Sequence, residues 1–500
     1  MKYSGLLALV IFAALPVFGQ TNLDLTTGKP RPMSLQDCFV EAIKHNFDIQ
    51  VERYTPQISL YALNGAYGGY DPTFDASGNH QYYRSGADGT VPSVNDQNNF
   101  SSSLSGGSPW GMTYGLSGNI GESYGQYGAS SITNLAGPFD GTSGQIQITA
   151  NQPLLRNFWV DNTRLAIKVA RNRLKYSDQS LRQQMITSVT AVENAYYELI
   201  FAEQNVEVET QALVLAQTQL DQDQQRVTIG SLAPLDVQQD EAQVASSQAN
   251  LISAISTLGT DERVLKNLIT DEYSGWFNTP IQPSVNLEAP LELFDLQDSW
   301  NKGLRNRPDL LQAKLDVEQQ GFTLQYDRNQ VFPELDLTGT YGYNGISREF
   351  SGAFNQFDEG NRPYYIYGAS ISVPLSNIKA RSTYKSDKAT KQQLLLKLKQ
   401  LEQNIMVDID NAVGVARSDY ESVQANRQAR IYAEAALDAE QKKYAVGKST
   451  TFTVLQLQNN LTAARSQEIR ALANYNQALA TLSQQEASTL ERDKIDIRAE

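Results

Sequence analysis

The side chains best suited to catalysis or metal binding are few and scattered in this 500-residue chain. The two histidines, His45 and His80, lie in unrelated contexts, and the single cysteine, Cys38, precludes a disulfide framework. No His/Cys spacing matches a metal site, and no phosphate-binding glycine loop or nucleophile elbow is present. We therefore expect no enzyme activity, no catalytic residue, no cofactor and no metal centre.

Carboxylates are the remaining candidates. Asp236, Asp240 and Glu241 follow closely on a turn-forming segment that contains Gly230 and Pro234. Closely spaced carboxylates can attract cations. Acidic residues at a helix start also interact favourably with the helix dipole and with water. Both interpretations remain open, and the other carboxylate pairs fall only on expected exposed helix faces.

Long helices must position these carboxylates. Neither Gly nor Pro occurs from Leu154 to Ile229, and no Pro follows Leu375. Such segments favour helix, and residues 162–227 would extend about 100 Å at 1.5 Å per residue. Apolar residues recur every seven positions in this segment, at Met185, Val192, Leu199, Val206, Leu213, Leu220 and Val227. This repeat predicts a left-handed supercoil. Both an ordinary coiled coil and a helical tube would show it.

Segments of alternating polarity precede the long helices. Residues near 73–83, 143–153, 333–344 and 363–375 alternate apolar and polar side chains over about the length of a barrel strand. Tyrosines near their ends suit an interfacial aromatic girdle. A soluble antiparallel sheet would also alternate, but four such segments, each joined to a helix, are more specific for a membrane barrel. Residues 97–120 alternate too, and they form either an added hairpin in the wall or an exterior loop.

The chain contains an internal duplication. Residues 35–37 (Leu-Gln-Asp) recur at 296–298, and the later pair Ile229-Gly230 matches Val446-Gly447. A tandem unit argues against many one-site enzyme folds. The predicted domains are a signal peptide (1–19), a first repeat (20–290) with a helical hairpin at 160–270, a second repeat (291–486) with a hairpin at 378–486, and a flexible tail (487–500).

The first 19 residues have the pattern of a secretory signal peptide. Lys2 precedes an apolar stretch, and small residues mark a cleavage site before Gln20. No later segment has the ~18 consecutive apolar residues of a membrane helix, so a membrane-crossing form would need strands closed into a barrel. The formal net charge of −14 disfavours nucleic acid as a partner.

From residue 34 to 486 the chain resembles the outer membrane efflux protein (TolC) family. The resemblance is carried by the tandem repeat, by the strand-ending Gln152-Pro153-Leu154-Leu155-Arg156, and by two helix-hairpin tips at 227–237 and 444–454. It implies a mixed α+β membrane protein, a homotrimer whose strands share one β-barrel in outer-membrane lipid. A long periplasmic α-helical coiled-coil barrel would extend from the end of this β-barrel.

The resemblance also implies a function. The trimer would be a passive, porin-like exit channel of a tripartite efflux or type I secretion system in a Gram-negative-type bacterium. Its partners would be a periplasmic adaptor (membrane fusion) protein and an inner-membrane transporter. A trimeric coiled-coil stalk or adhesin is the alternative, although a stalk would lack strands joined to each long helix. A secreted enzyme on a helical scaffold would need a pocket that the sequence does not show.

The hairpin tips are the functional residues that this resemblance assigns. Those expected to dock the adaptor are Val227, Gly230, Leu232, Pro234, Asp236, Val446, Gly447 and Ser449. The expected periplasmic gate region contains Asp236, Asp240, Thr453 and Gln456. Members of the family can carry acids at the last two positions, where they form cation-binding rings. Thr453 and Gln456 therefore argue against a cation-blocked entrance.

Overall fold

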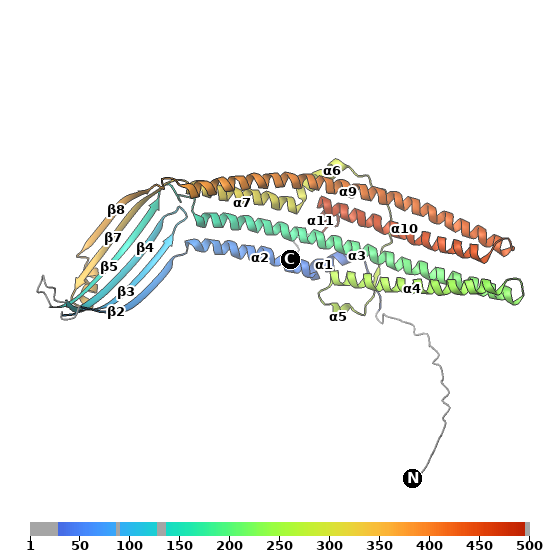
Figure 1. Ribbon diagram of the computed structural model, residues 1–500, viewed down its shortest axis with the longest axis horizontal. Helices are drawn as coiled ribbons and strands as arrows, with labels where there is room; N and C mark the ends of the chain where they lie inside the picture. The colour runs from blue at the N-terminus through green and yellow to red at the C-terminus, as the bar shows by residue number, and fades with distance from the viewer. Residues whose placement is uncertain (1–28, 87–90, 128–136, 496–500) are drawn as a thin grey trace, which may run out of the picture.

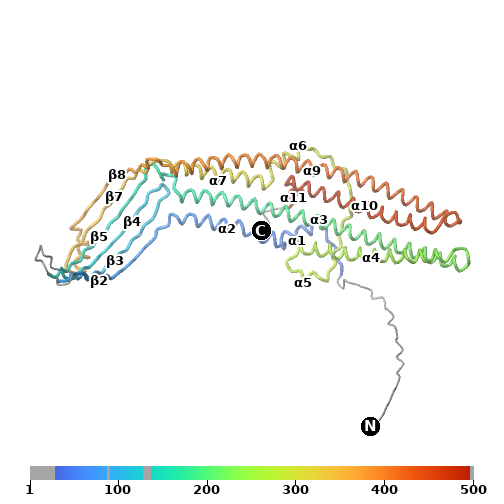
Figure 2. The backbone as a smooth tube through the Cα atoms, in the orientation of Figure 1, coloured from blue at the N-terminus to red at the C-terminus, as the bar shows by residue number. Residues whose placement is uncertain are grey.

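A computed structural model describes residues 29–86, 91–127 and 137–495, so the predicted signal peptide lies outside the described residues. The molecule is long and narrow, with a β-sheet at one end and two helical hairpins that reach the other end (Figure 1). The backbone tube shows the helices running side by side between these ends (Figure 2). Within the described ranges, no helix is both long enough and apolar enough to span a membrane.

The sheet has six antiparallel strands. In spatial order they are β2 (Thr73–Ser85), β3 (Ser93–Gly107), β4 (Thr113–Tyr127), β5 (Gly137–Pro153), β7 (Glu334–Ser347) and β8 (Pro363–Ser372). Residues 97–120 therefore belong to two strands of the sheet, β3 and β4, and to the short connection between them. β3 pairs with β2 on one side and with β4 on the other along nearly its whole length.

The two faces of the sheet differ in polarity because side chains alternate along each strand. One apolar row crosses four neighbouring strands through Leu104, Leu116, Ile148 and Tyr341, and these side chains are exposed. The opposite face is polar, with the hydroxyl groups of Ser77 and Ser101, for example, 2.8 Å apart. Exposed apolar surface on this scale marks a region that contacts lipid or another protein.

α8 (Phe350–Glu359), which connects β7 and β8, packs on the apolar face. Its Phe350 ring stands edge-on to Phe100 of β3, with ring centroids 6.3 Å apart. A Cβ added at Gly144 of β5 would come within 2.7 Å of the Phe357 ring, so the glycine makes room for this helix.

Four helices pack side by side next to the sheet, and four pack side by side nearer the tips. Each half of the chain supplies one very long helix, α3 (Asn162–Thr228, 67 residues) or α9 (Ile378–Ala445, 68 residues). Next to the sheet these pack with α2 (Phe47–Tyr67) and α7 (Pro308–Gln330), which follow α1 (Leu35–His45) and α6 (Leu296–Asn306). Nearer the tips they pack with the 36-residue returning helices α4 (Pro234–Ile269) and α10 (Thr451–Glu486).

The main apolar core lies at mid-length, where α1, α3 and α4 meet. Val192 of the predicted heptad seam is fully buried there, together with Cys38 and Leu265. A parallel pair of short strands, β1 (Arg31–Met33) and β6 (Ile281–Pro283), covers this core beside the connector helix α5 (Tyr273–Trp276). Toward the tips, polar residues are buried beside a small apolar cluster of Leu437, Tyr444, Val454 and Leu461. The buried polar residues there are Gln219, Asp223, Asp240, Ser247, Thr451 and Gln458.

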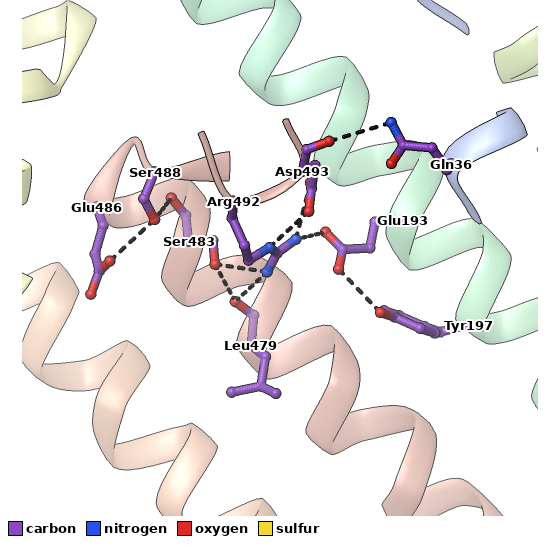
Figure 3. A network of polar contacts seen from close by, with 9 residues as sticks. All are labelled: Gln36, Glu193, Tyr197, Leu479, Ser483, Glu486, Ser488, Arg492 and Asp493. Atoms are coloured by element: carbon purple, nitrogen blue, oxygen red, sulfur yellow. Dashed lines mark hydrogen bonds and ion pairs between the residues drawn. The ribbon is translucent and has the colours of Figure 1, made fainter. Parts of the chain in front are cut away.

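The segment after α10, where a flexible tail was expected over residues 487–500, is docked as far as residue 495, and residues 496–500 lie outside the described residues. Residues 487–495 include α11 (Thr489–Arg492). The Arg492 guanidinium pairs with Glu193 of α3 at 2.5 Å and with Asp493 (Figure 3). Glu193 is only 2% exposed, and a buried carboxylate requires a cationic or hydrogen-bonding partner. Arg492 supplies that partner and so holds the segment in place.

Candidate gate and docking tips

Both hairpins reverse direction through the same kind of turn. Gly230 follows α3 with φ +75°, and Gly447 follows α9 with φ +73°. In each turn the residue after the glycine donates its backbone N–H to the carbonyl five residues earlier, Ser231 to Arg226 at 2.8 Å and Lys448 to Lys443 at 2.9 Å. This is a Schellman arrangement, in which glycine adopts positive φ without Cβ strain. The two glycines expected at the tips therefore have equivalent structural roles.

Apolar side chains are exposed around both turns. Ile229 is 78% exposed and Leu235 is 63% exposed at the first tip, and Val446 (68%) and Phe452 (64%) are exposed at the second. Val446 was among the expected docking residues, whereas the other three were not. All four exposed apolar residues lie within the two tip motifs at 227–237 and 444–454, and a protein interface requires such groups at its centre.

A polar cluster joins the two hairpins close to the tips. The Tyr444 hydroxyl on α9 lies 2.7 Å from both carboxylate oxygens of Asp223 on α3, and 2.8 Å from the Thr451 hydroxyl on α10. Gln219 donates to Asp223 at 2.8 Å, and the Arg226 guanidinium stacks 4.4 Å from the Tyr444 ring centroid. Burial raises the pKa of Tyr444, so its hydroxyl stays protonated and donates. We call these five residues the latch.

Asp240 on α4 brings a second carboxylate to the latch. Its side chain is fully buried, and no donor among the described residues reaches either of its oxygens. Burial, and then the neighbouring Asp223, raise the pKa of Asp240 to about 7, with a smaller contribution from Asp236. A proton shared between Asp240 and Asp223 satisfies both groups, whereas two ionised carboxylates in the same buried space repel each other.

The structure separates the four expected gate residues. Asp240 contributes to the latch, but Asp236 lies half-buried in the first turn of α4, where it suits the helix dipole. Thr453 is 3.0 Å from the Thr450 hydroxyl at the start of α10, and the Gln456 side chain is exposed.

Sequence reasoning missed Asp223 and Tyr444 as functional residues, although a signal was present. Asp223 occupies the second seam position of the α3 heptads, which is mostly small at earlier turns, as at Ala202 and Ala216. A charged residue on a buried seam must have a partner. Tyr444 lies on the corresponding seam of α9, seven residues after Leu437.

A sheet with an exposed apolar face, continued by helical hairpins about 100 Å long, is the architecture of bacterial outer-membrane channels. Solved channels share this fold. CusC is 15% identical with a TM-score of 0.68, covering 96% of this chain and 98% of that chain. The outer-membrane channel OprN is 14% identical with a TM-score of 0.67, covering 96% and 99%. The CmeC channel of Campylobacter jejuni is 13% identical with a TM-score of 0.66, covering 91% and 86%.

The chain belongs to the outer membrane efflux protein family, whose model matches residues 118–270 and 300–485. It is similar to TolC of Escherichia coli K12, with 27% identity over 298 residues, which cover 54% of this chain and 57% of that protein. TolC of Vibrio cholerae is 23% identical over 341 residues, covering 66% and 75%. The chain thus spans a little under three-fifths of the length of the Escherichia coli relative. Membership assigns it to the outer membrane, with its helices extending into the periplasm.

Proposed function

We propose that three copies of this chain form the exit duct of a tripartite efflux or type I secretion system. The sheet of one copy has two free edges, β2 and β8. Unpaired backbone groups cannot face lipid, so membrane strands must close into a barrel without edges. Joining β8 of each copy to β2 of the next removes every edge and turns the apolar face toward lipid. The observation that carries the proposal is that the sheet has both two free edges and an exposed apolar face.

The tips would dock a periplasmic adaptor that connects the duct to an inner-membrane transporter. The exposed side chains of Ile229, Leu235, Val446 and Phe452 offer apolar anchors at the far end of the hairpins. The turns that present them are fixed by their backbone hydrogen bonds, so little conformational freedom would be lost on binding. The duct is passive in this account, and the transporter supplies the energy.

The latch would hold the tip closed until the adaptor engages. Tyr444 and Asp223 tie α9 to α3, and parting the two hairpins breaks this contact. An uncompensated buried Asp223 would then be costly unless water or the adaptor reached it. Closure therefore depends on these polar contacts together with a small apolar cluster that includes Leu437, Val454 and Leu461, which suits an element that must move.

The cargo would be set by the partner transporter. One relative is named a pyoverdine export outer membrane protein, from Pseudomonas aeruginosa, at 23% identity over 319 residues. Another is named a cobalt-zinc-cadmium resistance protein, from Cupriavidus metallidurans, at 22% identity over 296 residues. Cargoes that differ so much in chemistry are consistent with a duct that has no dedicated binding site.

Photo-crosslinking at the tips tests the proposal. A photoreactive amino acid replaces Phe452 or Leu235 in cells of the native host, and Tyr54, an exposed residue on α2, is the matched control position. We expect both tip positions to capture one periplasmic adaptor, and Tyr54 not to capture it. Light scattering in detergent should give a trimer. A stable monomer would contradict the duct. Tips that capture nothing while export proceeds would contradict docking of the adaptor at the tips, whereas a trimer that captures nothing and exports nothing would favour the stalk alternative.

A further inference from the structure

The two halves of the duplicated chain contribute unequally to the sheet. The second repeat places β8 directly beside β7. The first repeat inserts β3 and β4 between β2 and β5, so that it supplies four strands where the second supplies two. The inserted hairpin is continuous with its neighbours, because Phe100 of β3 lies opposite both Gly78 of β2 and Ile120 of β4. Three copies would therefore close eighteen strands instead of twelve.

The added strands change the bore of the barrel. Strands about 4.8 Å apart and tilted by about 40° close at a backbone radius of about 18 Å for eighteen strands, but about 12 Å for twelve. Side chains occupy about 5 Å of that radius, half the spacing between packed sheets. The free radius is then about 13 Å with the hairpin and about 7 Å without it.

The radius of the eighteen-stranded barrel matches the radius of the helical tube to which it is joined. Four helices per copy give a ring of twelve, and helices spaced about 9–10 Å apart close at an axis radius of about 18 Å. An eighteen-stranded barrel therefore continues the tube at the same radius, whereas a twelve-stranded barrel at the same tilt would narrow it. α8 does not obstruct this path, because it packs against Phe100 on the lipid-facing side.

The inserted hairpin lines the lumen with uncharged groups. The polar face of β3 carries Asn95, Gln97, Asn99, Ser101, Ser103 and Ser105, and that of β4 carries Gly115, Ser117, Asn119, Gly121 and Ser123. None of these side chains is ionised, so this part of the wall neither selects by charge nor holds a charged cargo.

Resting on the duct function above, we propose that the β3–β4 hairpin is a specificity element that adapts the exit to partly folded polypeptide cargo. An α-helix with its side chains is about 10–12 Å across, and a packed helix pair is about 20 Å across because the axes lie 8–10 Å apart. A bore of about 26 Å passes such a pair, while one of about 14 Å passes a single helix. The uncharged polar face of the hairpin adds no selection by charge to the exit.

Graded thiol-reactive polymers measure this bore without depending on the tip gate. Gln147, on the lumen face of β5, is replaced by cysteine on a Cys38→Ala background, and polyethylene glycol maleimides of increasing hydrodynamic radius are added outside intact cells. The matched variant carries the same changes but has residues 86–136 replaced by residues 348–362, the corresponding connection of the second repeat. We expect labelling to stop near a radius of about 13 Å in the full chain and about 7 Å in the variant.

The largest reagent radius that labels the full-chain trimer tests the wide exit by itself, even if the shortened variant does not assemble. A full-chain trimer that excludes reagents above about 7 Å overturns the wide exit and leaves the duct function standing. Equal limits in the full chain and an assembled variant overturn it as well. A full chain that is monomeric by light scattering overturns the duct function itself.

Discussion

Asp240→Asn tests whether the proton shared with Asp223 holds the latch closed. The closed tip raises the pKa of Asp240 from 3.8 to about 7, first through burial and then through Asp223. In an opened, solvated tip this pKa returns toward 3.8. Between these two values the closed state retains a proton that the open state has lost, so closure weakens as the pH rises. The slope is about 1.4 kcal/mol per pH unit, on the order of 4 kcal/mol over the whole window.

The amide of the Asp240→Asn variant donates to Asp223 at every pH and does not titrate. We expect a tenfold increase in tip opening per pH unit in the unaltered protein between about pH 4 and pH 7, with no further change above. The variant should stay closed throughout. Hydrogen exchange of peptides covering 216–228 and 234–247 in the detergent-solubilised trimer, corrected for intrinsic exchange rates, measures the opening.

Asp236→Asn is the matched control, because it removes the same charge from the same helix at a half-buried position in its first turn. The control should keep most of the pH dependence, since Asp236 contributes less than burial or Asp223 to the pKa of Asp240. Equal protection of the unaltered tip at pH 5 and pH 8 would refute the shared proton. So would an Asp236→Asn variant that behaves like Asp240→Asn.

Two further predictions concern the tips. Replacing Gly230 and Gly447 together by valine should abolish adaptor capture and export at normal trimer yield, because a β-branched residue at positive φ costs about 1–2 kcal/mol or more at each turn. The double asparagine variant, which tolerates this conformation, should retain capture in a pull-down, and equal capture by both variants would contradict the role of the turns. Replacing Thr453 and Gln456 by aspartate should create a block of bilayer conductance by trivalent cations. A block of the unaltered protein at the same cation concentration would contradict this prediction.

The periodicities of the sequence were sufficient to place the main elements. Of the seven residues in the α3 heptad series, Met185, Val192 and Leu199 are buried and the four nearer the tip are half-buried. A repeat that matches the helix period keeps one face against its neighbours. The alternation of apolar and polar residues indicated extended structure in the β3–β4 segment, but it was compatible both with an added hairpin of the sheet and with an exterior loop. Only pairing partners distinguish them, and pairing is a non-local property.

The contacts of the site were less accessible from sequence. Asp223 and Tyr444 are 221 residues apart, and which side chains meet depends on how far two long helices slide and rotate against each other. The same limit applies to Arg492, whose partner Glu193 is 299 residues away. The basic residue alone suggested a solvated tail, because nothing in its neighbourhood identifies the buried carboxylate that it neutralises.

The internal repeat predicts the register of the contact between copies. Within one chain, β5 of the first repeat meets β7 of the second, with Thr149 opposite Thr340. β8 is the repeat equivalent of β5, since Pro374 follows it as Pro153 ends β5, and β2 is the equivalent of β7. Carrying the β5–β7 register over to the junction between copies places Ser370 of β8 opposite Asn79 of the next β2.

A disulfide at this junction tests the trimeric barrel most directly. Opposed residues of antiparallel strands lie about 4.5–5.5 Å apart at Cα, within disulfide range. On a Cys38→Ala background, the pair Asn79→Cys and Ser370→Cys should give covalent trimers on a non-reducing gel. The control pair Asn79→Cys and Tyr364→Cys, offset by about 20 Å along the strand, should not. Monomers from the predicted pair, or equal linking by the control pair, would contradict a barrel closed between β8 and β2 in this register.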